Sequence, residues 1–394
     1  MKLWEKKYQL NEQIENYTVG DDYMLDQKLV KYDCQASIAH AKMLKKIGIL
    51  TNEECDILSR ILNEIIKIND NGLFIIRQHD EDCHTAIENY LVKKLGSIGK
   101  KIHTARSRND QVITALRLYY KDEIKCIIQS IDSFIEILGK FKEKYSQIEM
   151  PGYTHMRKAM PSSVGSWADA FIESMEDNKL LLFQTFDLVD QSPLGTGAGY
   201  GLPIKLDRNL TTKLLGFKKT QKNPIYVQNS RGKFESAILH TLSQIMVDLN
   251  KMASDIILFS MSEFDYFKLT SEICTGSSIM PHKKNPDVLE IIRARYHQIV
   301  SYEFEVKGII GSLVSGYNRD IQLTKKPVIS GFEITKESLN IMGIVIKNLH
   351  VNKEKCKKAL TEELYATKRV YALVEKSIPF RDAYVKIAKE YTEK

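Results

Sequence analysis

The sequence predicts an all-α protein built around a bundle of long helices. Apolar residues recur every three or four positions from Arg108 to Gln147 and from Lys233 to Phe264. Shorter runs of the same kind extend from Asp287 towards Val314 and from Glu333 to Leu349. Only nine prolines interrupt the 394 residues, and the two-residue alternation that marks a strand is nearly absent. We therefore expect no major sheet.

The remaining sequence divides around this bundle. Shorter helical runs, among them Cys34 to Ile47 and Glu53 to Ile68, precede His103 and indicate a separate N-terminal domain. A small, charged stretch follows Leu349. The expected domains are residues 1–104, 105–348 and 349–394. Because the long helices are apolar around much of their girth, each needs neighbours on several sides, so we expect oligomerisation.

Composition and charge narrow the function. The net charge is +7, but Lys and Arg are spread among Asp and Glu without a basic block, which argues against nucleic-acid binding. No apolar stretch approaches the ~20 residues that would span a bilayer. The start, MKLWEKKYQL, lacks the apolar region of a secretory signal, and the six cysteines show no CxxC pairing. We expect a cytoplasmic protein that uses its positive charge to bind an anionic small molecule.

Three polar segments interrupt the helical pattern, at residues 103–110, 150–157 and 275–287. In the first, Arg106, Arg108 and Asn109 stand where the long helix begins. Guanidinium groups beside free backbone N–H groups form a natural carboxylate site. The alternative is an ordinary helix cap by Ser107 or Asp110 with solvated arginines.

The third segment has features of an anion-binding loop. Gly276 allows backbone amides to approach an anion, while Lys283 supplies charge and Asn285 a directed donor. The alternative is a flexible surface loop with solvated lysines. In the second segment, His155 follows Pro151 and Gly152 at an irregular position where a titratable ring could face a cavity, although most histidines are structural.

Two other clusters are interpreted as structural. The glycines from Gly195 to Gly201 fit neither GxGxxG nor a phosphate-binding loop and indicate a tight turn. The residues from His79 to His84 are rich in acidic and imidazole groups, but consecutive residues on a helix cannot all face one point. We expect no metal site and no cofactor.

Together the three segments resemble the signatures of the fumarase/aspartase superfamily. GSSIMPHKKNP at 276–286 matches the shared pattern GSSxMPxKxNP, and HTARSRNDQ at 103–111 resembles HTGRSRNDQ of the argininosuccinate lyase family. The resemblance covers nearly the whole chain. Further matching stretches are LDQKL (25–29), AHAKML (39–44), EDCHTAIE (81–88), MPGYTH (150–155), SPLGTGAG (192–199), YNRDIQ (317–322) and IPFRDA (378–383).

This resemblance implies a three-domain fumarase/aspartase-like fold and the elimination of argininosuccinate to arginine and fumarate. It makes Ser277 the catalytic base, with Lys283 and Asn285 holding the substrate carboxylate. It places His155 on the opposite side of the substrate, with Glu290 holding its ring. The substrate-binding positions that it implies are Asp26, Arg108, Asn109, Thr154, Tyr317, Gln322 and Lys325.

The resemblance also implies a homotetramer in which each active site takes segments from three subunits. Two departures stand close to the motifs: Ala105 replaces the usual glycine of HTGRSRND, and Arg157 replaces the usual glutamine of THxQ. A guanidinium two residues from His155 could reshape the substrate contacts. Two alternative functions remain: another fumarate-releasing lyase, such as an adenylosuccinate lyase, and a non-catalytic, crystallin-like structural protein.

Overall fold

The computed structural model describes residues 11–392 and confirms the all-α prediction. The stretch MKLWEKKYQL, on which the expectation of no secretory signal depends, lies outside these residues. The chain forms two compact units, described separately here. Unit 1 comprises residues 1–128, 180–243 and 299–334, and unit 2 comprises 129–179, 244–298 and 335–394. The expected boundaries near residues 104 and 348 stay predictions, because these units divide the long helices instead.

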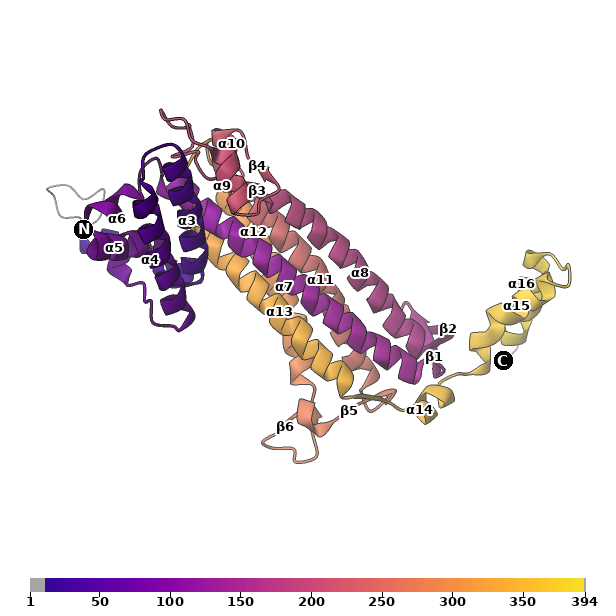
Figure 1. The fold of residues 1–394 in the computed structure, drawn as a ribbon. Coiled ribbons are helices and arrows are strands. Elements are labelled where there is room, and N and C mark those ends of the chain that lie inside the picture. Colours follow the sequence, from indigo (N-terminus) through magenta and orange to yellow (C-terminus); the bar gives the residue numbers. More distant parts are fainter. Residues whose placement is uncertain (1–10, 393–394) are drawn as a thin grey trace. The chain divides into compact units, whose positions relative to one another are not determined.

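The N-terminal part of unit 1 consists of short helices (Figure 1). The predicted runs at 34–47 and 53–68 appear as α3 (Val30–Lys46) and α4 (Asn52–Asp70), which pack together. Helix α4 begins at a capping box, in which the Thr51 hydroxyl accepts the Glu54 N–H and the Glu54 carboxylate accepts the Thr51 N–H. The other helices here are α1 (Glu12–Val19), α2 (Asp22–Leu25), α5 (Cys83–Leu95) and α6 (Ser97–Lys101).

Five long helices each contribute residues to both units: α7 (Arg108–Tyr145), α8 (Val164–Val189), α11 (Lys233–Phe259), α12 (Asp287–Ile310) and α13 (Lys325–Lys347). The apolar positions that predicted α7 are all buried, as expected for one wide apolar stripe. They are Ile113, Leu116, Tyr120, Ile124, Ile127, Ile131, Phe134, Leu138 and Phe141.

Helix boundaries differ from the predictions for identifiable reasons. Helix α13 begins at Lys325 rather than Glu333, because Pro327 lies in the first turn, where a missing N–H costs no hydrogen bond. Helix α11 ends at Phe259 rather than Phe264, since the chain turns through Asp265 at φ 51°. Helix α8 was not predicted.

The described strands are short and pair two by two, which confirms the expectation of no major sheet. The largest pair is the antiparallel hairpin of β1 (Glu149–Thr154) and β2 (Arg157–Ser163). The other pairs are β3 (Gln191–Ser192) with β4 (Lys219–Thr220), β5 (Phe267–Leu269) with β8 (Leu349–Val351), and β6 (Thr275–Gly276) with β7 (Lys284–Asn285).

The remaining helices are short. In unit 2, α15 (Ala366–Val374) and α16 (Phe380–Thr392) pack around a small core of Val370, Ala383 and Ile387. The others are α9 (Arg208–Leu214), α10 (Pro224–Asn229), α14 (Lys353–Lys358), and the 3₁₀ turns η1 (Asp26–Lys28), η2 (Gln78–Asp80), η3 (Ser271–Ile273), η4 (Arg319–Thr324) and η5 (Glu362–Tyr365).

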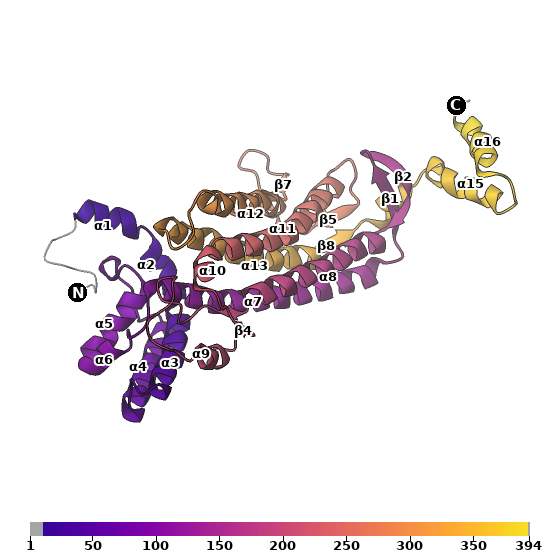
Figure 2. The same ribbon diagram turned by 90° about the horizontal axis from the view of Figure 1, so that it is seen from above.

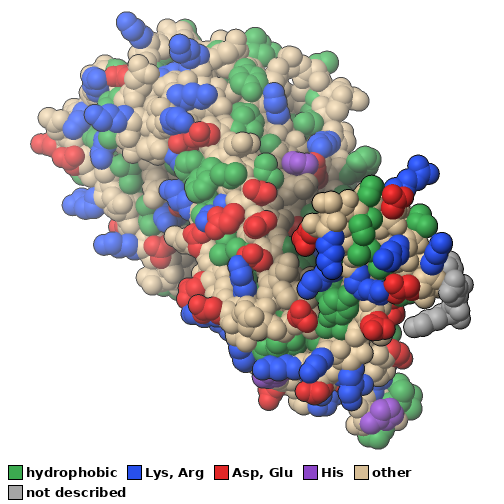
Figure 3. Space-filling model, turned by 90° about the vertical axis from the view of Figure 1, so that its right-hand side faces the viewer, with side chains coloured by type: hydrophobic (Ala, Val, Ile, Leu, Met, Phe, Trp, Pro, Cys, Tyr) green, Lys and Arg blue, Asp and Glu red, His purple; other side chains and the backbone are tan. Residues whose placement is uncertain are grey.

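The surface agrees with the charge pattern of the sequence. On the face shown in Figure 3, basic and acidic side chains are interspersed. Between residues 11 and 392, no helix is both long enough and apolar enough to cross a membrane.

Candidate active site

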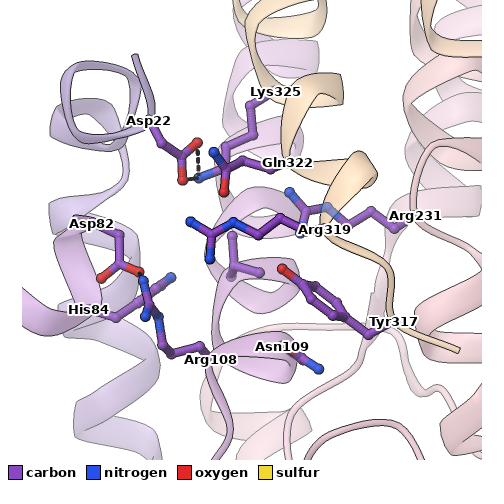
Figure 4. A pocket seen from close by; sticks show the side chains of 11 residues that line it. Asp22, Asp82, His84, Arg108, Asn109, Arg231, Tyr317, Arg319, Gln322 and Lys325 are labelled. Carbon is purple, nitrogen blue, oxygen red and sulfur yellow. Dashed lines mark hydrogen bonds and ion pairs between the residues drawn. The ribbon is translucent and has the colours of Figure 1, made fainter. Parts of the chain in front are cut away.

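A polar pocket of about 160 Å³ lies within unit 1 (Figure 4). Five positions implied by the family resemblance line it together, although they come from separate parts of the sequence: Arg108, Asn109, Tyr317, Gln322 and Lys325. The other lining residues are Asp22, Asp82, His84, Val112, Arg231 and Arg319. The structure therefore assembles most of the expected substrate-binding set from one compact unit.

Lys325 anchors one wall of this pocket. Its ammonium lies 2.6 Å from Asp26 Oδ1 and 2.7 Å from a carboxylate oxygen of Asp22. The other oxygen of Asp26 accepts the Cys83 N–H at 3.1 Å. Burial opposes the charge on Lys325, but the two carboxylates outweigh it and raise the pKa of the ammonium. Asp26 is fully buried behind Lys325, so it positions this cation rather than lining the pocket.

Arg108 forms the opposite wall, at the start of α7. Its guanidinium donates to Glu81 Oε2 at 3.0 Å and also to the Asp82 carboxylate (Figure 4). Burial disfavours the charge on Arg108, but Asp82 and Glu81 outweigh it and raise the pKa of the guanidinium. Arg108 is therefore held by two carboxylates and is not a solvated arginine, while its role in substrate binding stays a prediction.

Ser107 and Asp110 form the helix cap that was the alternative interpretation of this segment. The Ser107 hydroxyl accepts the Asn109 N–H, and Asp110 Oδ1 accepts the Ser107 N–H at 3.0 Å. The second oxygen of Asp110 accepts the N–H groups of Gly195 and Gly197, each at 2.9 Å. The glycine-rich segment is thus a tight turn held by Asp110, as predicted.

The remaining pocket residues differ in how firmly they are held. Gln322 donates from Nε2 to the carbonyl of Thr18 at 3.1 Å, and Asn109 donates to the carbonyl of Ala198 at 3.4 Å. Tyr317 is 37% exposed, and its ring stands at the pocket in Figure 4.

Sequence reasoning missed several residues of this pocket. Asp22 and Arg231 were not singled out, because none of the matching stretches contains them. Arg319 lies in the stretch YNRDIQ but was given no role, and Asp82 was considered only as a metal ligand. His84 was considered only as a metal ligand. Its Nδ1–H donates to Asp33 Oδ1 at 2.9 Å. Burial lowers the pKa of His84, but the Asp33 carboxylate outweighs burial and raises it.

One group of metal-ligating residue types was also not anticipated. The ligand atoms of Asp26, Cys83 and His84 lie within 4.8 Å of one another. However, Asp26 already accepts from Lys325 and from the Cys83 N–H, and His84 donates to Asp33. These atoms therefore belong to the hydrogen-bond network behind the pocket.

The catalytic candidates belong to unit 2, in two exposed segments. Ser277 is half-buried in the loop between β6 and β7, and its Oγ accepts the N–H groups of Met280 at 3.1 Å and Ile279 at 3.4 Å. Lys283 is exposed on the same loop. Asn285 donates to the carbonyl of Gly276 at 3.4 Å, which closes the loop at its base. Backbone donors aimed at a serine oxygen favour its alkoxide form.

His155 lies at the tip of the β1–β2 hairpin. Thr154 pairs with Arg157, and the two residues between them, His155 and Met156, have φ of 53° and 58°. Two successive positive φ angles are typical of the tight turn that joins antiparallel strands. Thr154, His155 and Arg157 are all exposed. The turn therefore presents the histidine to solvent.

The structure does not bring His155, Ser277 and Glu290 together within one chain. Figures 1 and 2 show the β1–β2 hairpin and the β6–β7 loop at separate places. Among the described residues, no hydrogen bond or ion pair joins His155 to Glu290, which is exposed in the first turn of α12. The expected roles of these residues stay predictions.

The comparisons with known proteins agree with the motifs. A lyase family model matches residues 9–301. An argininosuccinate lyase of Thermotoga neapolitana is 54% identical over 99% of this chain and 98% of its own length. One of Phocaeicola vulgatus is 39% identical over 98% of this chain and 86% of its own.

A solved structure supports the fold. The class II fumarase of Schistosoma mansoni superposes with a TM-score of 0.79 at 16% identity, covering 99% of this chain and 94% of the fumarase. The all-α architecture with long central helices therefore matches the fold of this fumarase. Identity along almost the full length shows that this chain belongs to the argininosuccinate lyase family of carbon–nitrogen lyases.

Proposed function

We propose that this chain reversibly cleaves argininosuccinate to L-arginine and fumarate, a reaction of arginine biosynthesis. The observation that carries the proposal is the pocket of unit 1, which gathers Arg108, Asn109, Tyr317, Gln322 and Lys325. Its mixed charge suits the substrate, because argininosuccinate has three carboxylates and also a cationic amino-acid end. The 54% identity to a named argininosuccinate lyase supports the same assignment.

Ser277 serves as the base. As an alkoxide, it removes a proton from the succinyl carbon next to the carbon that carries nitrogen. The N–H groups of Met280 and Ile279 stabilise this alkoxide, which an ordinary serine would not form at neutral pH. The electron pair of the broken C–H bond moves into the adjacent carboxylate, giving an aci-carboxylate that Lys283 and Asn285 hold.

Collapse of this intermediate expels arginine. The aci-carboxylate electrons form the carbon–carbon double bond of fumarate, and the carbon–nitrogen bond breaks. The departing guanidino nitrogen receives a proton from His155, either directly or through a water molecule. Glu290 orients the ring of this histidine. No metal or cofactor is needed for this elimination.

The active site requires more than one chain in this proposal. His155 is exposed at a hairpin tip and lies apart from the Ser277 loop in Figures 1 and 2, so neighbouring subunits have to supply the missing groups. Exposed apolar residues on the long helices of unit 1 offer surface for that contact, including Leu180 (60% exposed), Phe183 (51%) and Phe304 (77%). We propose a homotetramer with a shared helical bundle and a cytoplasmic location.

A substrate comparison tests this function. The purified protein should form fumarate from argininosuccinate, followed by ultraviolet absorbance, and should leave adenylosuccinate uncleaved. Cleavage of adenylosuccinate alone would identify a different fumarate-releasing lyase. Failure to cleave either substrate, by a protein that is folded and assembled, would favour a crystallin-like structural role.

A further inference from the structure

Arg231 is a buried arginine that lines the pocket of unit 1, and two of its guanidinium nitrogens have no hydrogen-bond partner within the described part of the chain. The residue is only 4% exposed, yet its Nε and Nη2 have no hydrogen-bond partner among the described residues. In Figure 4 it approaches from the side of Tyr317 and Arg319, across from Asp82 and His84. A buried charge is costly unless it is paired, so this guanidinium calls for an anion.

The carboxylates near Arg231 do not supply that anion, because each is engaged by another group. Asp22 and Asp26 bind the Lys325 ammonium, and Glu81 and Asp82 bind Arg108. Glu235 accepts the Gly232 N–H and the Tyr120 hydroxyl.

Two other arginines of unit 1, buried Arg117 and half-buried Arg208, are satisfied by the fold itself, whereas buried Arg106 has an Nε without a partner among residues 11–392 but donates to the Ser37 hydroxyl at 2.7 Å. Arg117 donates to the Gln191 carbonyl at 2.6 Å and to the Ser230 hydroxyl at 2.8 Å, and it lies over the Phe234 ring. Arg208 donates to the carbonyls of Leu194 and Gln221, each within 3.0 Å. Arg231 differs from both, because its Nε and Nη2 have no acceptor within the described fold while the residue itself lines the pocket.

We propose that Arg231 binds the α-carboxylate of the arginine half of argininosuccinate. This inference rests on the proposed function, in which Lys283 and Asn285 hold the succinyl carboxylate beside the breaking bond. The amino-acid end of the arginine half then remains for the pocket of unit 1. Asp22 lines the same pocket, and although its carboxylate binds Lys325, its oxygens have further lone pairs that can accept from the α-ammonium. The pocket therefore complements both charges of an α-amino acid.

Arginine and agmatine separate this role from a structural one. Agmatine has the guanidinium and amine of arginine but no α-carboxylate. The wild-type protein should bind L-arginine at least about tenfold more tightly than agmatine, because the carboxylate fills otherwise unpaired buried donors. Arg231→Gln should weaken arginine binding by about 10- to 100-fold and leave agmatine binding nearly unchanged. Titration calorimetry on the assembled protein measures both affinities.

The matched control is Arg208→Gln, which removes a satisfied guanidinium outside the pocket and should keep the preference for arginine. Arg231→Lys keeps the charge but loses the paired donors, so it should retain only part of the preference, and it decides the question if the Gln variant does not fold. An undiminished preference in a folded Arg231 variant would overturn the proposal. If the wild-type protein cleaves no argininosuccinate, the proposed function fails, while the calorimetric comparison still decides the role of Arg231.

Discussion

The pocket of unit 1 and the motif segments of unit 2 differ in how much of each is built by contacts within the chain. In the pocket, Lys325 is 2% exposed and Asp26 fully buried, and both are fixed by short ion pairs. On the segments, Met156 is 72% exposed beside His155, and Ile279 is 86% exposed near Ser277.

This difference separates binding from chemistry. The pocket is organised before any ligand arrives, which lowers the entropic cost of binding. The Ser277 loop and the His155 turn have local hydrogen bonds that set their shapes, but few apolar contacts that hold them in place. The chain alone therefore forms a binding half, and we infer that assembly completes the catalytic half.

The largest expected effect comes from the catalytic half. Ser277→Ala should lower kcat by at least about 10²-fold and leave argininosuccinate affinity largely intact, because it removes the base and not a binding group. Fumarate absorbance gives kcat, and calorimetry gives the affinity. Ser278→Ala, which changes the neighbouring exposed hydroxyl, is the control. Near-normal turnover by Ser277→Ala would remove Ser277 from the mechanism.

Mutations of the ion pairs in the pocket should lower the free energy of unfolding. Lys325→Met removes the ammonium that pairs with half-buried Asp22 and fully buried Asp26, and should lower the free energy of unfolding by about 3–5 kcal/mol. Lys326→Met breaks only an exposed pair with Asp21 and should cost under about 1 kcal/mol. Urea denaturation measures both variants. Equal, small losses would show that the pocket is not held by this buried pair.

Acid should weaken unit 1 through His40. Burial, together with Arg106, lowers the pKa of this histidine to about 3. The unfolded chain binds a proton at His40 near pH 6.5 and the folded chain does not. The contribution of neutral His40 to the free energy of unfolding is therefore fully present above about pH 6.5. Below that pH it falls by about 1.4 kcal/mol per pH unit.

Urea midpoints between about pH 7 and pH 5 test this dependence. His40→Gln, whose amide can still donate to the Thr104 carbonyl, should reduce the slope relative to the parent protein. His79→Gln changes an exposed imidazole and should leave the slope as it was. An unchanged slope in His40→Gln would assign the acid sensitivity to other groups.

The smallest effect concerns the turn before α7. Ala105, where the family has glycine, adopts φ 58°, a left-handed conformation that costs a residue with a Cβ about 1–2 kcal/mol. Ala105→Gly removes this strain, but glycine loses more backbone entropy on folding, which offsets part of the gain. The free energy of unfolding should therefore rise by up to about 1 kcal/mol. Ala372→Gly, at an exposed position in α15, should instead destabilise by about the same amount. Destabilisation by Ala105→Gly would show that the turn is not strained.

The sequence predicted the fold and the residues of the pocket unequally well. Long apolar periodicity predicted α7 and α11, because each helix buries a wide stripe. The family resemblance named Arg108, Gln322 and Lys325, which the structure brings together in one pocket. Periodicity missed the start of α13, because Pro327 in a first turn resembles a break. Arg231 was not predictable, since neither its neighbours in sequence nor their spacing indicates that its donors would be buried without a partner.

Subunit complementation tests the central claim most directly. Chains carrying Ser277→Ala and chains carrying His155→Ala should each be nearly inactive. If each active site takes the two residues from different chains, random mixing and reassembly should restore up to about one quarter of the sites.

Mixing Ser277→Ala with Lys283→Met is the matched control. Both residues lie on the same β6–β7 loop of one chain, so no mixed site can contain both intact, and activity should stay at the level of the single variants. Recovery with the His155 pair but not with the Lys283 pair is the result that a shared site predicts. No recovery with the His155 pair, after mass spectrometry has verified subunit exchange, would contradict it.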